Sequence, residues 1–136
     1  MAGTVKASII QHDVSNVATV FKDGAGTEIG QLTKTWCNYN AVGTSVRASF
    51  NTSSVTKNAT ANYTFNFTNS FSDANYSLSG SAQQNNSYYT HLHFGPYGPG
   101  SLTVSSVTCI TPYNSGSGSG DIQYVDAIYC LMSINR

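Results

Sequence analysis

Two histidines separated by one residue form the pattern in this chain that most resembles a metal-binding motif. His91 and His93 flank Leu92 in a stretch that reads as a strand, and side chains two positions apart in a strand point to the same face. Imidazole nitrogens ligate many transition metals. Two ligands are too few for a complete site, and the third histidine, His12, lies far away in the sequence. Two interpretations therefore stay open, a partial metal site and a pair of solvated or hydrogen-bonded histidines.

A second group of residues suits the recognition of a ligand surface. Four tyrosines lie in or beside turns rich in Asn, Ser and Gly, namely Tyr88, Tyr89, Tyr97 and Tyr113. A tyrosine ring stacks on a sugar or protein surface while its hydroxyl forms a hydrogen bond. These tyrosines are candidate receptor- or glycan-binding residues, on loops expected over 83–89, 95–100 and 113–120. The alternative is that the rings cap the ends of the fold or lie between subunits.

Acid and base catalysis has little support in the sequence. The only close carboxylates on one expected strand are Asp121 and Asp126, and residues five positions apart in a strand point to opposite faces. No nucleophile elbow, phosphate-binding loop or zinc-ligand spacing occurs. We therefore expect no catalytic residues and no enzyme activity, and no cofactor beyond the metal considered at the histidine pair.

The composition is that of a polar but nearly uncharged chain. Only 9% of the 136 residues are charged and the net charge is zero, against about 25% charged residues in an average soluble domain. The six Lys and Arg residues are scattered, so we expect no nucleic-acid binding. No apolar run approaches the length of a membrane span, and residues 1–10 lack the apolar segment of a signal peptide. Membrane insertion is therefore not expected either.

Three cysteines cannot all form disulfides within one chain. Cys109 and Cys130 lie in apolar runs that read as strands, where a cysteine usually acts as a small buried hydrophobic residue. Free thiols at Cys37, Cys109 and Cys130 are the simpler interpretation, and a Cys109–Cys130 disulfide across adjacent strands is the alternative.

The elements that must position these residues read as β-strands. Apolar and polar residues alternate over 45–50 and 63–68, which predicts two half-buried strands. Their expected apolar faces carry Val46, Ala48 and Phe50 in the first and Tyr63, Phe65 and Phe67 in the second.

Two further strands are expected over 101–110 and 122–134. Their expected apolar faces carry Leu102, Val104 and Ile110 in the first, and Ile122, Tyr124, Ile128, Cys130, Met132 and Ile134 in the second. The stretches 94–100 and 111–120 are rich in Gly, Pro or Ser and predict loops. Residues 111–120 would then be the tip of a long hairpin.

The stretch from Trp36 to Tyr76 contains a spaced series of aromatic and polar residues. The series consists of Trp36, Asn38, Tyr39, Gly43, Arg47, Ser49, Ser53, Ser54, Val55, Thr56, Tyr63, Phe65, Phe67, Ala74, Asn75 and Tyr76. In order and spacing it resembles a segment that recurs in bacteriophage fibre and other virion proteins. One departure is the turn before Tyr63, where residues 57–61 replace the Asp and glycines usual in that family.

The resemblance implies a non-enzymatic virion structural protein that is made in the bacterial cytoplasm. Together with the strand pattern it predicts an all-β fold, an antiparallel β-sandwich knob over 36–136. Residues 1–35 are then a β-rich N-terminal arm that packs on the sandwich or reaches a neighbouring subunit. Similar proteins use such an arm for trimerisation or attachment, which implies a homotrimer. In some of them, three His-x-His motifs around the threefold axis supply six nitrogens to an iron-like ion.

The expected function is therefore that of a tail or head fibre or knob that mediates assembly and adhesion to the host surface. Other virion proteins and a host-surface glycan or protein are the expected partners. A capsid decoration protein and a free carbohydrate-binding module are the alternatives. Within the motif, we expect Trp36 to anchor the core and Arg47 to pair with a carboxylate such as Asp73.

Overall fold

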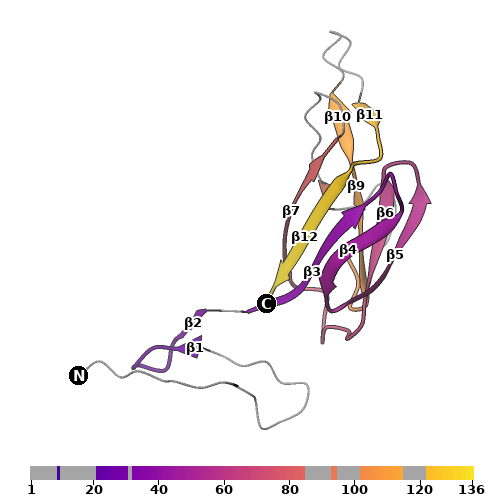
Figure 1. Cartoon of the computed structure of the whole chain (residues 1–136). Coiled ribbons are helices and arrows are strands. Elements are labelled where there is room, and N and C mark those ends of the chain that lie inside the picture. The colour runs from indigo at the N-terminus through magenta and orange to yellow at the C-terminus, as the bar shows by residue number, and fades with distance from the viewer. Residues whose placement is uncertain (1–8, 10–20, 31, 85–92, 95–101, 115–121) are drawn as a thin grey trace. The chain divides into compact units, whose positions relative to one another are not determined.

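The computed structural model describes residues 9, 21–30, 32–84, 93–94, 102–114 and 122–136 (Figure 1). The chain divides into two compact units, Met1–Leu32 and Thr33–Arg136. Strand β3 begins at Thr33, so the boundary expected between residues 35 and 36 falls inside this strand. The described residues form strands and no helix. None of them builds a helix long and apolar enough to cross a membrane.

The first unit contains a short antiparallel hairpin of β1 (Phe21–Lys22) and β2 (Glu28–Gly30). Asp23 organises its turn, because one carboxylate oxygen accepts the N–H groups of Ala25 and Thr27, both at 2.9 Å. Gly26 has a φ of 86°, a left-handed conformation that glycine adopts without steric penalty.

The second unit contains two four-stranded antiparallel sheets and a short hairpin (Figure 1). The first sheet has the order β4 (Ser45–Phe50), β3 (Thr33–Asn40), β12 (Tyr129–Asn135) and β7 (Ser77–Gln83). The second has the order β5 (Thr52–Ala59), β6 (Asn62–Phe67), β9 (Ser106–Ile110) and β8 (His93–Phe94). The hairpin pairs β10 (Pro112–Asn114) with β11 (Ile122–Tyr124). The predicted all-β, antiparallel fold class is confirmed.

Side chains from both sheets meet in one hydrophobic core, which makes the unit sandwich-like. The ring of Tyr39 on β3 packs edge-on against Tyr63 and Phe65 on β6, with centroids 5.6 and 6.1 Å apart. The core cluster comprises Cys37, Tyr39, Ala41, Tyr63, Phe65, Phe67, Val107, Cys109, Ala127, Cys130, Met132 and Ile134. Burial of the predicted apolar face of β6 is therefore confirmed.

Strand β4 differs from the half-buried strand that the alternation predicted, because all six of its residues are exposed. It forms an edge of its sheet. The register of β4 on β3 shifts between Asn38 and Tyr39. Phe50 therefore lies opposite the outward-facing Trp36, whereas Val46 lies opposite the buried Tyr39. A bulge of this kind moves residues two positions apart to opposite faces, so the expected apolar face of β4 does not exist.

The strand predicted over 101–110 begins only at Ser106. The hydroxyl of Thr103 accepts the N–H groups of Ser106 and Ser105 at 2.9 and 3.2 Å, which holds the chain in a turn. Side-chain hydrogen bonds of this kind compete with strand pairing. Leu102 and Val104 consequently remain exposed, in contrast to the prediction, whereas Ile110 is buried.

The long final strand predicted over 122–134 is two strands, β11 and β12, separated by residues 125–128. Ile122 and Tyr124 are exposed, which corrects the prediction, while the burial of the later apolar residues Cys130, Met132 and Ile134 is confirmed. Asp126 lies in this interruption, where its carboxylate accepts the N–H of Ala61 at the turn between β5 and β6.

The three cysteines are free and buried in the core, so the interpretation of Cys109 and Cys130 as buried residues of strands is confirmed. Burial raises the pKa of the Cys37 thiol to about 11 and that of Cys130 to about 12. It also raises the pKa of Cys109 well above its usual value. Because the thiolate is the reactive species, the folded core protects all three thiols chemically as well as sterically.

We therefore expect a thiol reagent such as DTNB to label none of the three cysteines in the folded protein at pH 8. Labelling should follow the global unfolding transition in urea and reach three thiols per chain. Rapid labelling of one thiol in the absence of denaturant, followed by stopped-flow absorbance, would contradict the described core.

Candidate functional site

The outer side of the first sheet carries aromatic and apolar side chains that no other described strand covers. Strand β3 alternates between buried Thr35, Cys37 and Tyr39 and outward-facing residues, so Trp36 points away from the core. Trp36 is 40% exposed, and the expectation that it anchors the core is wrong. Its position follows from the period of two in a strand.

The residues around Trp36 form two rows across the sheet, which we call the Trp36 face. Strand pairing places one row at Phe50, Trp36, Ser133 and Ser79 and the next at Ala48, Asn38, Leu131 and Ser81. Phe50 is 54% exposed and Leu131 is 40% exposed. The hydroxyls of Ser79 and Ser133 lie 2.7 Å apart and share a hydrogen bond. The Trp36 face thus combines two aromatic rings and a leucine with hydroxyl and amide groups.

A shallow groove of about 310 Å³ lies on this face between β3, β12 and β7. It is lined by Trp36, Cys37, Asn38, Ser79, Gly80, Ser81, Leu131, Met132 and Ser133. None of these side chains carries a charge at neutral pH. The small side chains of Ser79 and Ser81 on β7 leave room beside the larger side chains of β3 and β12. The groove can therefore admit a small, uncharged chemical group.

Arg47 borders the Trp36 face and is held by neighbouring groups. Its guanidinium carbon lies 4.3 Å from the centroid of the Tyr129 ring, a favourable cation–π arrangement. The guanidinium also donates to the Asn38 side-chain oxygen at 3.4 Å and to the carbonyl of Ile128. Within the chain, Asp73 forms its ion pair with Arg136 and not with Arg47, in contrast to the expectation. These contacts assign Arg47 a structural role at the edge of the face.

The outer side of the second sheet has a different chemistry. Its outward residues are hydroxyl and amide side chains that bind one another across the strands. The Thr64 and Thr108 hydroxyls lie 3.0 Å apart, and the Asn66 amide donates to Ser54 at 3.0 Å. The Asn58 amide donates to Thr64 at 2.9 Å. Because these groups satisfy one another, this side offers fewer free groups to a partner than the Trp36 face does.

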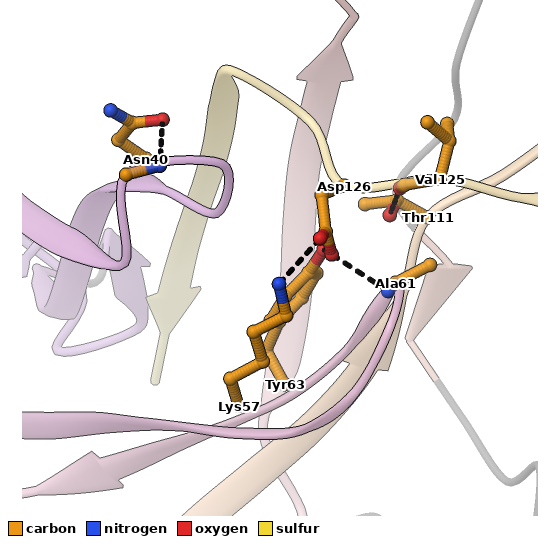
Figure 2. A network of polar contacts seen from close by, with 8 residues as sticks. Asn40, Lys57, Ala61, Tyr63, Thr111, Val125 and Asp126 are labelled. Atoms are coloured by element: carbon orange, nitrogen blue, oxygen red, sulfur yellow. Dashed lines mark hydrogen bonds and ion pairs between the residues drawn. The ribbon is translucent and has the colours of Figure 1, made fainter.

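A second constellation surrounds Asp126, which lies between β11 and β12 (Figure 2). One of its carboxylate oxygens accepts the Tyr63 hydroxyl at 2.6 Å and the Ala61 N–H at 2.9 Å. The other oxygen forms an ion pair with Lys57. Nearby, the Thr111 hydroxyl donates to the Val125 carbonyl. The carboxylate therefore joins the segment before β12 to the β5–β6 hairpin of the other sheet.

The protonation of this network suits a structural role. Burial raises the pKa of Tyr63, and its hydrogen bond to the Asp126 carboxylate raises it further. Burial alone would raise the pKa of Asp126 as well, but the hydrogen bonds from Ala61, Lys57 and Tyr63 and the Lys57 charge outweigh it and lower that pKa. Asp126 is thus ionised and Tyr63 neutral at pH 7. The network fixes the turn at Ala61, whose φ of 59° is unusual for a residue other than glycine.

The candidate ligand residues expected from the sequence lie mostly outside the described residues. This holds for Tyr88, Tyr89, Tyr97 and His91, and for the side chains of His93 and Tyr113. The backbones of the last two residues belong to β8 and β10. Among the described residues, no group of three His, Cys, Asp or Glu side chains could hold a metal ion.

Comparisons with protein-family models, with curated protein sequences and with solved structures find no match to this chain. The Trp36 face must therefore be interpreted from its own chemistry. Sequence reasoning missed it because Trp36 was assigned to the core. The signal was the alternation of Trp36 and Asn38 with Thr35, Cys37 and Tyr39, which already placed the two sets on opposite sides.

Proposed function

We propose that this chain is a non-enzymatic bacteriophage virion protein, a fibre or knob of the tail or head that mediates assembly and adhesion to the host surface. The resemblance of residues 36–76 to fibre and virion segments supports this proposal, and the all-β, sandwich-like unit is compatible with it. The observation that carries the proposal is the Trp36 face, a partly apolar surface on the outside of a sheet.

Such a face favours a role in contacts with other molecules. Single exposed apolar residues are ordinary on proteins, but a contiguous group marks an interaction surface more often than chance. Here Phe50 and Trp36 are paired across adjacent strands, and the groove beside them extends to Leu131. The low charge of the chain fits a component that packs against other virion proteins or adheres to an outer surface.

In this proposal the two units have separate tasks. The N-terminal unit attaches the chain to the particle or joins three copies, and the second unit presents the Trp36 face. Three copies on each fibre and several fibres on each particle would turn weak contacts into strong attachment, because linked binding events raise the effective concentration. In some of the fibre proteins that the segment resembles, such a trimer binds a metal ion through its His-x-His motifs, and His91 and His93 form the corresponding motif here.

The oligomeric state gives the first test. We expect multi-angle light scattering of the purified full chain to yield three times the mass of one chain. A fall to the single-chain mass in the presence of EDTA would show that a metal ion holds the copies together, and loss of the trimer in His91→Ala and His93→Ala would then assign these two residues as its ligands. An unchanged mass would leave a trimer without a metal. A monomer at micromolar concentration, both alone and with added iron(II) or zinc, would contradict the trimer.

A further inference from the structure

We infer that the groove beside Trp36 is a binding site for a neutral glycan, with the indole as the platform on which one sugar ring stacks. The inference rests on the proposed adhesive function and names the class of ligand that this function would use. The proposed site lies on the outer side of the first sheet, whereas the sequence predicted ligand binding on the tyrosine-rich loops.

The indole of Trp36 has the exposure and surroundings that a stacking platform requires. It is 40% exposed on a strand whose backbone is paired on both sides, by β4 and by β12. Because the paired backbone is already fixed, binding has to order only the side chain of Trp36 and not a loop, which limits the entropic cost. No described residue accepts a hydrogen bond from the indole N–H, so this donor is available to a ligand hydroxyl.

Polar groups stand where the hydroxyls of a stacked sugar would reach them. Ser133 lies directly across from Trp36, and Ser79 lies directly across from Ser133 on β7. Their two hydroxyls share one hydrogen bond of 2.7 Å. Because each hydroxyl has one donor and two acceptor sites, the pair keeps one free donor and further lone pairs. Asn38 and Ser81 add an amide and a hydroxyl in the next row.

The charge and size of the groove select among ligands. Its lining is uncharged, so a phosphate or carboxylate group would lose hydration without gaining a countercharge. Two cations of the described residues lie on this side without lining the groove. Arg47 is bound to the Ile128 carbonyl and stacked on Tyr129, and Lys34 lies two residues before Trp36 on β3. The groove volume of about 310 Å³ lies at the lower limit of small-molecule sites, about 300–1,000 Å³. These properties fit one or two neutral sugar rings.

The single tryptophan of the chain makes the inference directly measurable. We would titrate the full chain with maltotriose, chitotriose and a panel of neutral and acidic bacterial oligosaccharides, and follow Trp36 emission and its quenching by acrylamide. We expect at least one neutral glycan to shift the emission and protect the indole, with millimolar or tighter affinity. Acidic glycans without neutral sugars should have no effect.

Variants separate stacking from folding. Trp36→Ala should weaken binding about tenfold or more, which corresponds to about 1.4 kcal/mol. Trp36→Phe should retain part of the affinity. Because both variants lack the fluorescent indole, their affinities would be measured by isothermal titration calorimetry. Ser81→Phe, which fills the groove at an exposed position, should abolish binding while Trp36 is retained. Phe21→Ala is the matched control, because Phe21 has similar exposure and lies in the other unit.

Two results would overturn the inference. The first is an absence of neutral-glycan binding by a folded chain that still associates with phage particles, which would leave the proposed function intact. The second is a change in oligomeric mass on Trp36→Ala with no change in glycan binding, which would make the Trp36 face a contact between copies. A chain that binds glycans but is absent from particles would instead contradict the proposed function alone.

Discussion

Replacing Phe65 by alanine is expected to lower the free energy of unfolding by about 3–5 kcal/mol, the range measured for truncation of fully buried aromatic residues. The Phe65 side chain is completely buried and contacts the ring of Tyr39 from the opposite sheet. The substitution removes apolar contacts between the two sheets and leaves a cavity in the core that they share. Because small domains have only about 5–15 kcal/mol of stability, the variant should be close to unfolding at 37 °C.

The matched control is Phe50→Ala, which removes the same side chain from an exposed position on β4. We expect its unfolding midpoint in urea to differ little from that of the unmodified chain. Circular dichroism and the emission of Trp36 report both transitions. Equal effects of the two substitutions would show that the core is not located between the two sheets as described.

Replacing Asp126 by alanine is expected to cost about 2–4 kcal/mol, because it leaves two polar groups without their acceptor at about 1–3 kcal/mol each. These groups are the hydroxyl of the buried Tyr63 and the N–H of Ala61. Lys57 loses its ion pair as well, but this pair is partly exposed and adds little. Asp126→Asn keeps one acceptor oxygen and should have a smaller effect. Asp73→Ala, which removes an exposed ion pair with Arg136, is the control.

The contribution of Asp126 should also depend on pH. The pKa of Asp126 in the folded chain lies below its unfolded value of about 4. Its stabilisation is therefore complete above about pH 4 and is lost as the pH falls through the folded pKa. Urea titrations of the unmodified chain and of Asp126→Asn should give free energies of unfolding that converge as the pH falls below the folded pKa of Asp126. A constant difference between pH 7 and pH 2 would contradict an ionised Asp126 in this network.

Local patterns in the sequence predicted those parts of the fold in which period-two alternation meets a buried face. The alternation of Tyr63, Phe65 and Phe67 correctly predicted the apolar face of β6, and Cys130 to Ile134 correctly predicted that of β12. Both strands lie in the interior of their sheets and pair with a neighbouring strand on each side. This pairing fixes the face of the sheet to which each side chain points. Such strands follow the simple pattern.

The errors occurred where a tertiary contact or a single side chain overrides the alternation. A register shift between β3 and β4 splits the apparent apolar face of β4. The turn at the Thr103 hydroxyl delays the start of the strand predicted from residue 101 until Ser106. The contacts of Asp126 divide the final strand. These effects depend on which residues meet across the sheets, and the sequence alone does not contain that information.

The candidate site shows the same contrast. The candidate ligand residues were expected on tyrosine-rich loops, and Trp36 was expected in the core, whereas the structure places Trp36 on the outer side of its sheet. Trp36, Phe50, Ser79 and Ser133 become neighbours only through the sheet order β4-β3-β12-β7. Nothing in the local sequence pairs a serine of residues 77–83 with a tryptophan of residues 33–40.

The most direct test of the virion assignment is to detect this chain in purified particles. Particles of the phage whose genome encodes this chain would be banded in a density gradient. Peptides of the chain would then be quantified by mass spectrometry in each fraction. We expect the chain to band with the particles. Its copy number per particle, calibrated against the other particle proteins, should be a multiple of three. Its recovery only in the particle-free fractions would contradict the proposal that it is a structural component of the virion.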